Sequence, residues 1–389
     1  MTAPFAPRYI VVLGQRASWP EMLARTRMVE ELGFDGLYLV DHYFGRIDLD
    51  EPTHEAWTML GALAPFTQSM RLGVLVCGNT YRNPAFLLKQ AVTVDHISNG
   101  RVDFGVGAGW LEREHEAYGF PLPPPRERVD RFEEALGIWN ALQHQYRTTW
   151  DGEHYQLLDA PFEPKPVQPQ GLPLLIGSSG RRMMRLVAEH ADIWNTIGTP
   201  AEADATNRKL DAICAEVGRD PSTLRRSVSP SLNLLESPET FAAGVAAYHT
   251  AGFTDITFPW PRVEAEVPVL REVARTILPR LHQEEVPAST SSPDALSAIT
   301  PDDTEDVTVI VAALDPVARS FVALLAANPG SVVEHGQVMT ALGLDHHADV
   351  TRLAMGIATV FEAAGWKRPW LEVQKGYTVS PDLAALLSH

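Results

Sequence analysis

The chain has 389 residues, a formal net charge of −17, an apolar fraction of 45% and only two cysteines, Cys77 and Cys214. Two cysteines exclude a disulfide framework beyond one bridge, which favours a reducing, cytoplasmic compartment. The N-terminus lacks a signal-peptide pattern, and no run of about 18 apolar residues predicts a membrane span. The acidic balance repels phosphate backbones and disfavours nucleic acid as the main partner.

Short apolar runs alternate with helical patterns over the first three quarters of the chain. The predicted strands are 10–14, 36–42, 71–76, 101–107, 173–177, 191–195, 226–235 and 255–260. The predicted helices are 19–33, 55–68, 84–100, 126–143, 180–190, 202–218, 239–252 and a final one ending near 285. The Pro-rich stretch 144–172 is predicted to be irregular. This alternation implies a parallel sheet, and its count predicts an α/β fold of the (β/α)₈ barrel type. A doubly wound sheet would usually carry a glycine fingerprint at its first turn, which GQRASW lacks.

The remaining residues predict a linker and a second domain. Residues 286–306 are rich in Pro, Ser, Thr and Asp, which is typical of a linker between a domain 1–285 and a domain 307–389. Helical patterns followed by a β-hairpin resemble a small α+β winged-helix module. Residues 301–389 hold five basic and eleven acidic side chains, a balance of −6, whereas a DNA-binding wing needs a basic face. We therefore expect this domain to serve regulation or association, such as a homodimer.

The carboxyl ends of barrel strands are where active sites form. The second predicted strand ends in Asp41-His42. Histidine titrates near neutrality and can move a proton beside a redox centre, and Asp41 could orient its ring or bind a substrate group. The alternative is a plain strand-end turn with His42 bonded to the backbone.

The next two strand ends offer room and polar edges for a flat heterocycle. The third strand is followed by Cys77, Gly78, Asn79, Thr80 and Tyr81. The glycine permits close approach by a ring, and the polar residues match its carbonyl and nitrogen edges. The fourth strand ends in Gly107, Ala108, Gly109 and Trp110, where Trp110 breaks the dinucleotide fingerprint. This segment predicts backbone cleared for a ring, with Trp110 as a pocket wall or as core.

The fifth strand leads directly into a helix through small residues and two arginines. The segment is Gly177, Ser178, Ser179, Gly180, Arg181 and Arg182. Free backbone N–H groups and the helix dipole favour an anion there, so it predicts a phosphate site. The alternative is a tight turn with solvated arginines. No metal site is predicted, because neither His54-Glu55 nor His115-Glu116 has the second histidine of a zinc motif.

Residues 74–136 and 164–195 together resemble the luciferase-like monooxygenase superfamily, and most closely its deazaflavin (coenzyme F420)-dependent branch. The resemblance covers residues 8 to 285 and implies a (β/α)₈ barrel with insertions. It implies a cofactor ring over a bulge in the third strand, with a non-prolyl cis peptide at Cys77–Gly78 or a neighbouring bond. It also implies His42 near the reacting carbon and the cofactor phosphate on residues 177–181. Ala108 departs from the catalytic glutamate of the sugar-phosphate dehydrogenases in this group, which argues against that activity.

The function implied is hydride transfer between F420 and a small organic substrate, with His42 as proton donor or acceptor. An FMN-dependent monooxygenase remains an alternative, because FMN and F420 share ring shape and phosphate position. A second alternative makes the barrel a cofactor sensor and the C-terminal domain a transcriptional regulator.

Overall fold

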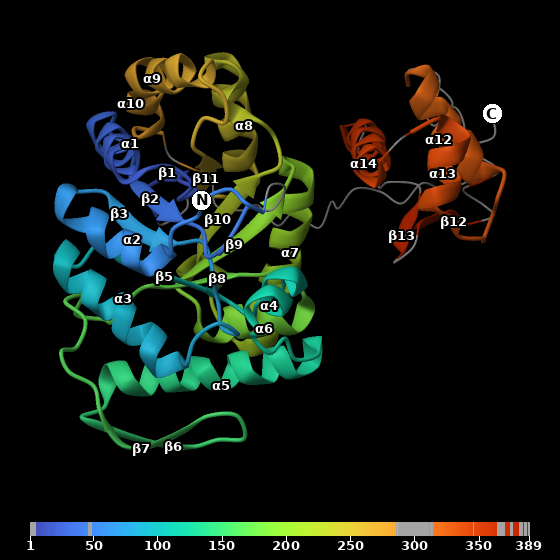
Figure 1. Cartoon of the computed structure of the whole chain (residues 1–389). Helices are drawn as coiled ribbons and strands as arrows, with labels where there is room; N and C mark the ends of the chain where they lie inside the picture. The colour runs from blue at the N-terminus through green and yellow to red at the C-terminus, as the bar shows by residue number, and fades with distance from the viewer. Residues whose placement is uncertain are drawn as a thin grey trace. The chain divides into compact units, whose positions relative to one another are not determined.

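The computed structural model describes residues 5–45, 49–284, 286, 311, 314–344, 346–363, 370–373, 376–380, 384 and 387. The chain divides into two compact units, Met1–Ser291 and Ser292–His389 (Figure 1). No helix within the described residues is long and apolar enough to span a membrane. The predicted linker 286–306 lies outside these residues except for Val286.

The first unit is a closed barrel of eight parallel strands. Its strands are β1 (Arg8–Val12), β2 (Gly36–Leu39), β3 (Arg71–Val74), β5 (Val102–Gly107), β8 (Leu174–Gly177), β9 (Ile193–Gly198), β10 (Arg225–Pro230) and β11 (Asp255–Pro259). The sheet runs β3-β2-β1-β11-β10-β9-β8-β5, and a pairing of β5 with β3 closes the ring. The predicted barrel is therefore confirmed, strand for strand. Strand β10 ends at Pro230, five residues before the predicted end.

Helices surround the barrel, most of them placed between successive barrel strands in the sequence (Figure 1). They are α1 (Trp19–Glu31), α2 (Ala56–Leu63), α3 (Pro84–Ser98), α5 (Pro125–His144), α6 (Arg181–His190), α7 (Pro200–Val217), α8 (Pro238–Thr250), α9 (Glu266–Thr276) and the short α10 (Leu278–Leu281). Three 3₁₀ turns connect elements: η1 (Ala64–Phe66), η2 (Pro221–Thr223) and η3 (Leu234–Glu236). Local signals set the helix starts. Asn83 caps α3 ahead of Pro84, and Thr199 forms a capping box with Glu202 on α7.

Two insertions depart from the predicted elements. Residues predicted to be irregular form an antiparallel hairpin, β6 (Arg147–Asp151) and β7 (Gln156–Pro161), drawn beyond α5 in Figure 1. Trp150 anchors it, because its Nε1 donates to Glu134 of α5 at 3.0 Å. A short helix, α4 (Glu112–Tyr118), occupies the loop after β5.

A buried ionic network fills the amino-terminal end of the barrel. Asp103 and Asp255 are almost fully buried. Their carboxylates pair with arginines from the first positions of three strands: Arg8, Arg71 and Arg225. Burial alone would raise the pKa of Asp103, but Arg8 and Arg71 outweigh it and hold the pKa below its ordinary value. The network closes the end of the barrel away from the carboxyl ends of its strands.

The second unit has a separate hydrophobic core, which includes Phe321, Trp370 and Tyr377. Its described elements are α12 (Pro316–Ala326), β12 (Val333–Glu334), α13 (His335–Leu342), α14 (His347–Ala363), β13 (Leu371–Val373) and β14 (Gly376–Thr378). The strands form an antiparallel sheet in the order β12-β14-β13.

Candidate active site

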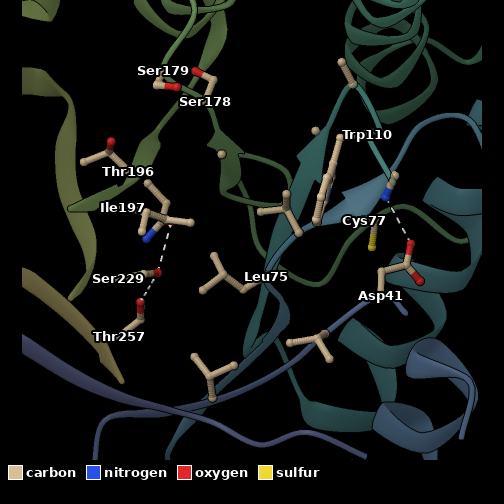
Figure 2. A pocket seen from close by; sticks show the side chains of 18 of the residues that line it. Asp41, Leu75, Cys77, Trp110, Ser178, Ser179, Thr196, Ile197, Ser229 and Thr257 are labelled. Carbon is tan, nitrogen blue, oxygen red and sulfur yellow. Dashed lines mark hydrogen bonds between the residues drawn. The ribbon is translucent and has the colours of Figure 1, made fainter. Parts of the chain in front are cut away.

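A cavity of about 650 Å³ lies at the carboxyl ends of the barrel strands. It gathers residues from every predicted site segment, and Figure 2 shows Asp41, Cys77, Trp110 and Ser178 around it. The predicted residues that line it are Asp41, His42, Cys77, Gly78, Tyr81, Gly107, Ala108, Gly109, Trp110, Gly177, Ser178, Ser179 and Gly180. The topology explains this, because all eight strands run in the same direction and their ends meet at one rim.

The third strand carries a bulge that points into the cavity. Gly73 pairs with Asp103 and Cys77, in the two-residue strand β4 (Cys77–Gly78), pairs with Val106. Three residues therefore separate the paired positions on the third strand and two on β5, an excess of one. Leu75 projects into the cavity from this bulge (Figure 2). A non-prolyl cis peptide lies at Leu75–Val76, two bonds upstream of Cys77–Gly78 and so one bond beyond the neighbouring bond that the resemblance implied.

The glycines at the strand ends make room for this bulge. A Cβ atom added at Gly107 would lie 3.0 Å from Val76 Cγ2, and one added at Gly177 would lie 3.1 Å from the same atom. A Cβ at Gly105 would clash with the backbone of Val74. The glycines therefore clear space for the protein's own third strand at the cavity, and room there for a cofactor ring stays a prediction.

Asp41 is held in an ion pair that supports the bulge. Its Oδ2 accepts from the Gly78 N–H at 3.0 Å, and its two oxygens accept from Arg82 at 2.7 and 2.8 Å. Arg82 also pairs with Glu55 at 2.7 Å. A bidentate, buried arrangement fixes position and leaves the carboxylate little freedom for proton transfer. The expectation that Asp41 orients the His42 ring is corrected, because another residue makes that contact.

Glu114 of α4 is the residue that holds His42. Its side chain is fully buried, and its Oε2 lies 3.0 Å from His42 Nδ1. Oε1 accepts from the Tyr43 N–H and Oε2 from the Tyr81 hydroxyl, both at 2.8 Å. Burial raises the pKa of Glu114, but the hydrogen bonds from His42, Tyr43 and Tyr81 outweigh it and hold that pKa below the ordinary value. Sequence reasoning missed this residue, since Glu112, Glu114 and Glu116 look alike in the sequence.

The loop from β8 to α6 fits a phosphate group. The Ser178 hydroxyl is buried and has no hydrogen-bond partner within the described structure. Gly180 is the N-cap of α6 and supplies no side-chain cap, so the N–H groups of the first helical turn stay available. The backbone of Ser178 is fixed, donating to Asn195 O at 3.1 Å and accepting from Trp194 Nε1 at 3.0 Å. A fixed loop with free donors at a helix start is suited to an anion.

Three residues predicted as ligands make contacts with other protein groups. Arg181 is 81% exposed in its side chain and pairs with Glu216 at 3.3 Å. Asn79 donates to the Tyr155 hydroxyl at 3.2 Å, and Thr80 Oγ1 lies 2.7 Å from His115 Nε2. None of the three lines the cavity. Arg182 also faces away, pairing with Asp130 and Glu133 of α5.

The wall opposite the bulge is polar and was not predicted. Ser229 Oγ lies 2.7 Å from Thr257 Oγ1 and 3.4 Å from Asn195 Oδ1, which links β9, β10 and β11 across the floor (Figure 2). Arg262, in the loop after β11, lines the cavity and its guanidinium has no partner among the described residues. Asn195, Ser229 and Thr257 lie within β9, β10 and β11, and neither they nor Arg262 belong to a distinctive sequence motif.

The cavity mouth combines aromatic and aliphatic surface. Trp110 is 57% exposed, and its ring stands edge-on to that of His42, with centroids 6.1 Å apart. Ile197 at the end of β9 is 73% exposed. Trp110 is therefore a pocket wall rather than core. Among the residues described, no group of three or more His, Cys, Asp or Glu side chains could hold a metal ion.

The closed parallel barrel and the cavity at the carboxyl ends of its strands define an enzyme-type barrel scaffold. The family profile described as "Luciferase-like monooxygenase" matches residues 4–327. The chain belongs to this family, which confirms the resemblance. It is an enzyme of the luciferase-like oxidoreductase family.

Individual relatives cover different shares of the chain. An uncharacterized protein of Mycobacterium tuberculosis (strain ATCC 25618 / H37Rv) is 30% identical over 262 residues, 62% of this chain and 88% of the relative. An F420-dependent glucose-6-phosphate dehydrogenase of Beutenbergia cavernae is 34% identical over 206 residues, 52% of this chain and 60% of the relative. An F420-dependent secondary alcohol dehydrogenase, solved with an F420-acetone adduct, matches with a TM-score of 0.62 and 18% identity, covering 69% of this chain and 98% of that one. The last likeness concerns the fold alone.

Proposed function

We propose that this chain transfers a hydride between coenzyme F420 and a small organic substrate, with His42 donating or accepting the accompanying proton. The observation that carries the proposal is the His42–Glu114 pair at the cavity. A histidine held by a buried carboxylate at a barrel strand end is equipped to move a proton. The F420-dependent relatives support the choice of cofactor.

The residues available to hold the cofactor come from two strand ends. Ser178, Ser179 and Gly180 would bind its phosphate through the orphan hydroxyl and free N–H groups. The bulge at Leu75 and Val76 would support its ring, with Trp110 beside it. When bound, the deazaflavin would supply the hydride acceptor or donor, and the chain supplies orientation, polarity and the proton path.

The substrate is proposed to be something other than a sugar phosphate. Ala108 lines the cavity, and the resemblance implies a glutamate at this place in the sugar-phosphate dehydrogenases of the group. The apolar mouth at Trp110 and Ile197 suits a substrate with a hydrophobic body.

The test compares the two cofactors on the same protein. The full-length chain is titrated with F420 and with FMN, and binding is followed by absorbance and fluorescence, with mass spectrometry of any cofactor that co-purifies. We expect F420 to bind at least tenfold more tightly. Tighter binding of FMN, with oxygen consumption when reduced FMN is supplied, would instead establish the monooxygenase alternative.

For the second unit we propose a winged-helix-like domain that mediates association or regulation. The described part of the unit holds three helices and three short strands, with β14 pairing antiparallel to both β12 and β13, and this arrangement supports the assignment. The acidic balance of residues 301–389 argues against a DNA contact. Duplex DNA binding by the full-length chain, if tight and salt-sensitive, would favour the regulator alternative.

A further inference from the structure

We infer that Glu114 is a positioning residue that holds His42 in one tautomer, with the proton on Nδ1 and Nε2 presented to the cavity. The inference deepens the proposed function, on which it rests for the role of His42 in proton transfer. It depends on the contacts of one buried carboxylate, which the family assignment does not specify.

The Glu114 carboxylate is arranged to remain charged and to accept hydrogen bonds. Its side chain is fully buried, yet Tyr43 N–H and the Tyr81 hydroxyl both donate to it at 2.8 Å. Donors on both oxygens favour the ionised form, which agrees with the lowered pKa of this group. An ionised carboxylate has no proton to give, so the His42–Glu114 hydrogen bond must take its proton from the ring.

The consequence for His42 follows from the two ring nitrogens. Nδ1 lies 3.0 Å from Glu114 Oε2, so a neutral ring carries its proton there. Nε2 has no hydrogen-bond partner among the described residues, while His42 lines the cavity. The nitrogen left to the cavity is therefore an acceptor in the neutral ring. When it takes up a proton, the imidazolium lies against an existing negative charge.

The same contacts fix the orientation of the ring. Glu114 is on α4, and Tyr81 follows the bulge of the third strand, so the carboxylate ties two loops to the end of β2. Trp110 covers the ring edge-on from the segment before α4. Rotation of the imidazole by a half-turn would break the Glu114 contact and turn Nδ1 away from its one partner among the described residues. A hydrogen bond to a charged group favours one arrangement by about tenfold or more.

Nuclear magnetic resonance of the unliganded protein tests the inference without a substrate. The full-length chain is labelled with ¹⁵N-histidine, and the His42 ring signals are assigned by their loss in His42→Asn. At alkaline pH the wild-type ring should show the Nδ1–H tautomer as the major form. In Glu114→Gln, whose amide can donate as well as accept, that preference should fall by about tenfold. Glu112→Gln, an exposed neighbour on the same helix, is the matched control and should leave the signals unchanged.

Two further measurements distinguish the role of Glu114 from a general structural disturbance and test the cofactor proposal independently. Tyr81→Phe removes one donor to Glu114 but leaves the His42 contact, so the Nδ1–H form should persist. F420 titration of each variant reports cofactor binding independently of the tautomer. A predominant Nε2–H form in the wild type, or an unchanged tautomer ratio in a folded Glu114→Gln, would overturn the inference. If the wild type shows the expected tautomer but does not bind F420, the cofactor proposal alone would be overturned.

Discussion

Replacing Ser178 by alanine should weaken cofactor binding through the phosphate alone. The hydroxyl is buried at the turn between β8 and α6 and has no protein partner within the described structure. A buried hydroxyl without a hydrogen-bond partner costs free energy, and that cost is offset when the hydroxyl donates a hydrogen bond to a bound anion. Arg181, three residues further along, provides a contrast because it carries charge but faces Glu216.

The magnitudes of the two substitutions differ for structural reasons. A hydrogen bond from a buried donor to a charged acceptor contributes about 1.5–3 kcal/mol, which corresponds to roughly a tenfold to 150-fold change in Kd. Arg181 is 81% exposed, so solvent and salt screen it. Arg181→Ala should therefore change the Kd by about twofold or less.

The assay is a thermodynamic cycle between protein and ligand. Wild type, Ser178→Ala and Arg181→Ala are each titrated with F420 and with a deazaflavin that lacks the phosphate, and fluorescence reports binding. Ser178→Ala should weaken F420 binding tenfold or more and leave the phosphate-free ligand nearly unaffected. Equal losses for the two ligands, or a larger loss in Arg181→Ala, would refute the assignment of this loop as the phosphate site.

Further outcomes are expected at other sites. His42→Ala should bind F420 within about twofold of the wild type and lower turnover by roughly 10²-fold, and a wild-type rate would remove His42 from the chemistry. Arg262→Ala should raise the KM of anionic substrates selectively, which a panel of acids and their neutral amides would check. Burial lowers the pKa of His249 from 6.5 to about 4, so the unfolded chain binds this proton more tightly. The contribution of neutral His249 to the free energy of unfolding is complete above pH 6.5. It declines by up to about 3 kcal/mol as the pH falls towards 4. Denaturant titrations at pH 7.5 and 4.5 should show this decline, and His249→Gln should lessen it. A chain ending at Ser291 should stay folded and bind F420 but change in oligomeric state or substrate access. Size-exclusion chromatography and steady-state kinetics would measure these two properties. Unchanged values for both would show that the second unit has no such role.

The barrel could be predicted because its signals are local and repeated. Most of the strands are short apolar runs buried on both faces, and several helices begin with a proline or a capping residue, as at Asn83-Pro84 and Thr199-Pro200. The β6–β7 hairpin was not predicted, because its strands are mostly exposed and show little apolar alternation. It is held by long-range contacts such as that of Trp150 with Glu134.

The place of the site could be predicted, but the direction of its side chains could not. Parallel strands bring residues 41–42, 77–81, 107–110 and 177–180 to one rim whatever their side chains do. Direction depends on neighbours from other elements. Asn79 and Thr80 turn towards Tyr155 and His115, while Arg181 turns towards α7. Each contact joins residues at least 35 positions apart, and a single sequence contains no pattern that records it.

The same limit explains why the charged residues that matter most were the hardest to assign. Glu114 is 72 residues from His42 in the chain, and Asp103 is 95 from Arg8. In the sequence, Glu114 has other glutamates nearby at 112 and 116, and Asp103 lies within an apolar strand. A buried carboxylate is unfavourable unless its partners are in place, so its burial itself indicates that partners converge there. At the amino end of the barrel the partners of Asp103 are arginines, whose charge is fixed, and the ion pairs close that end of the barrel. At the carboxyl end the partner is a histidine, whose charge can change, and that difference makes the second site suited to chemistry.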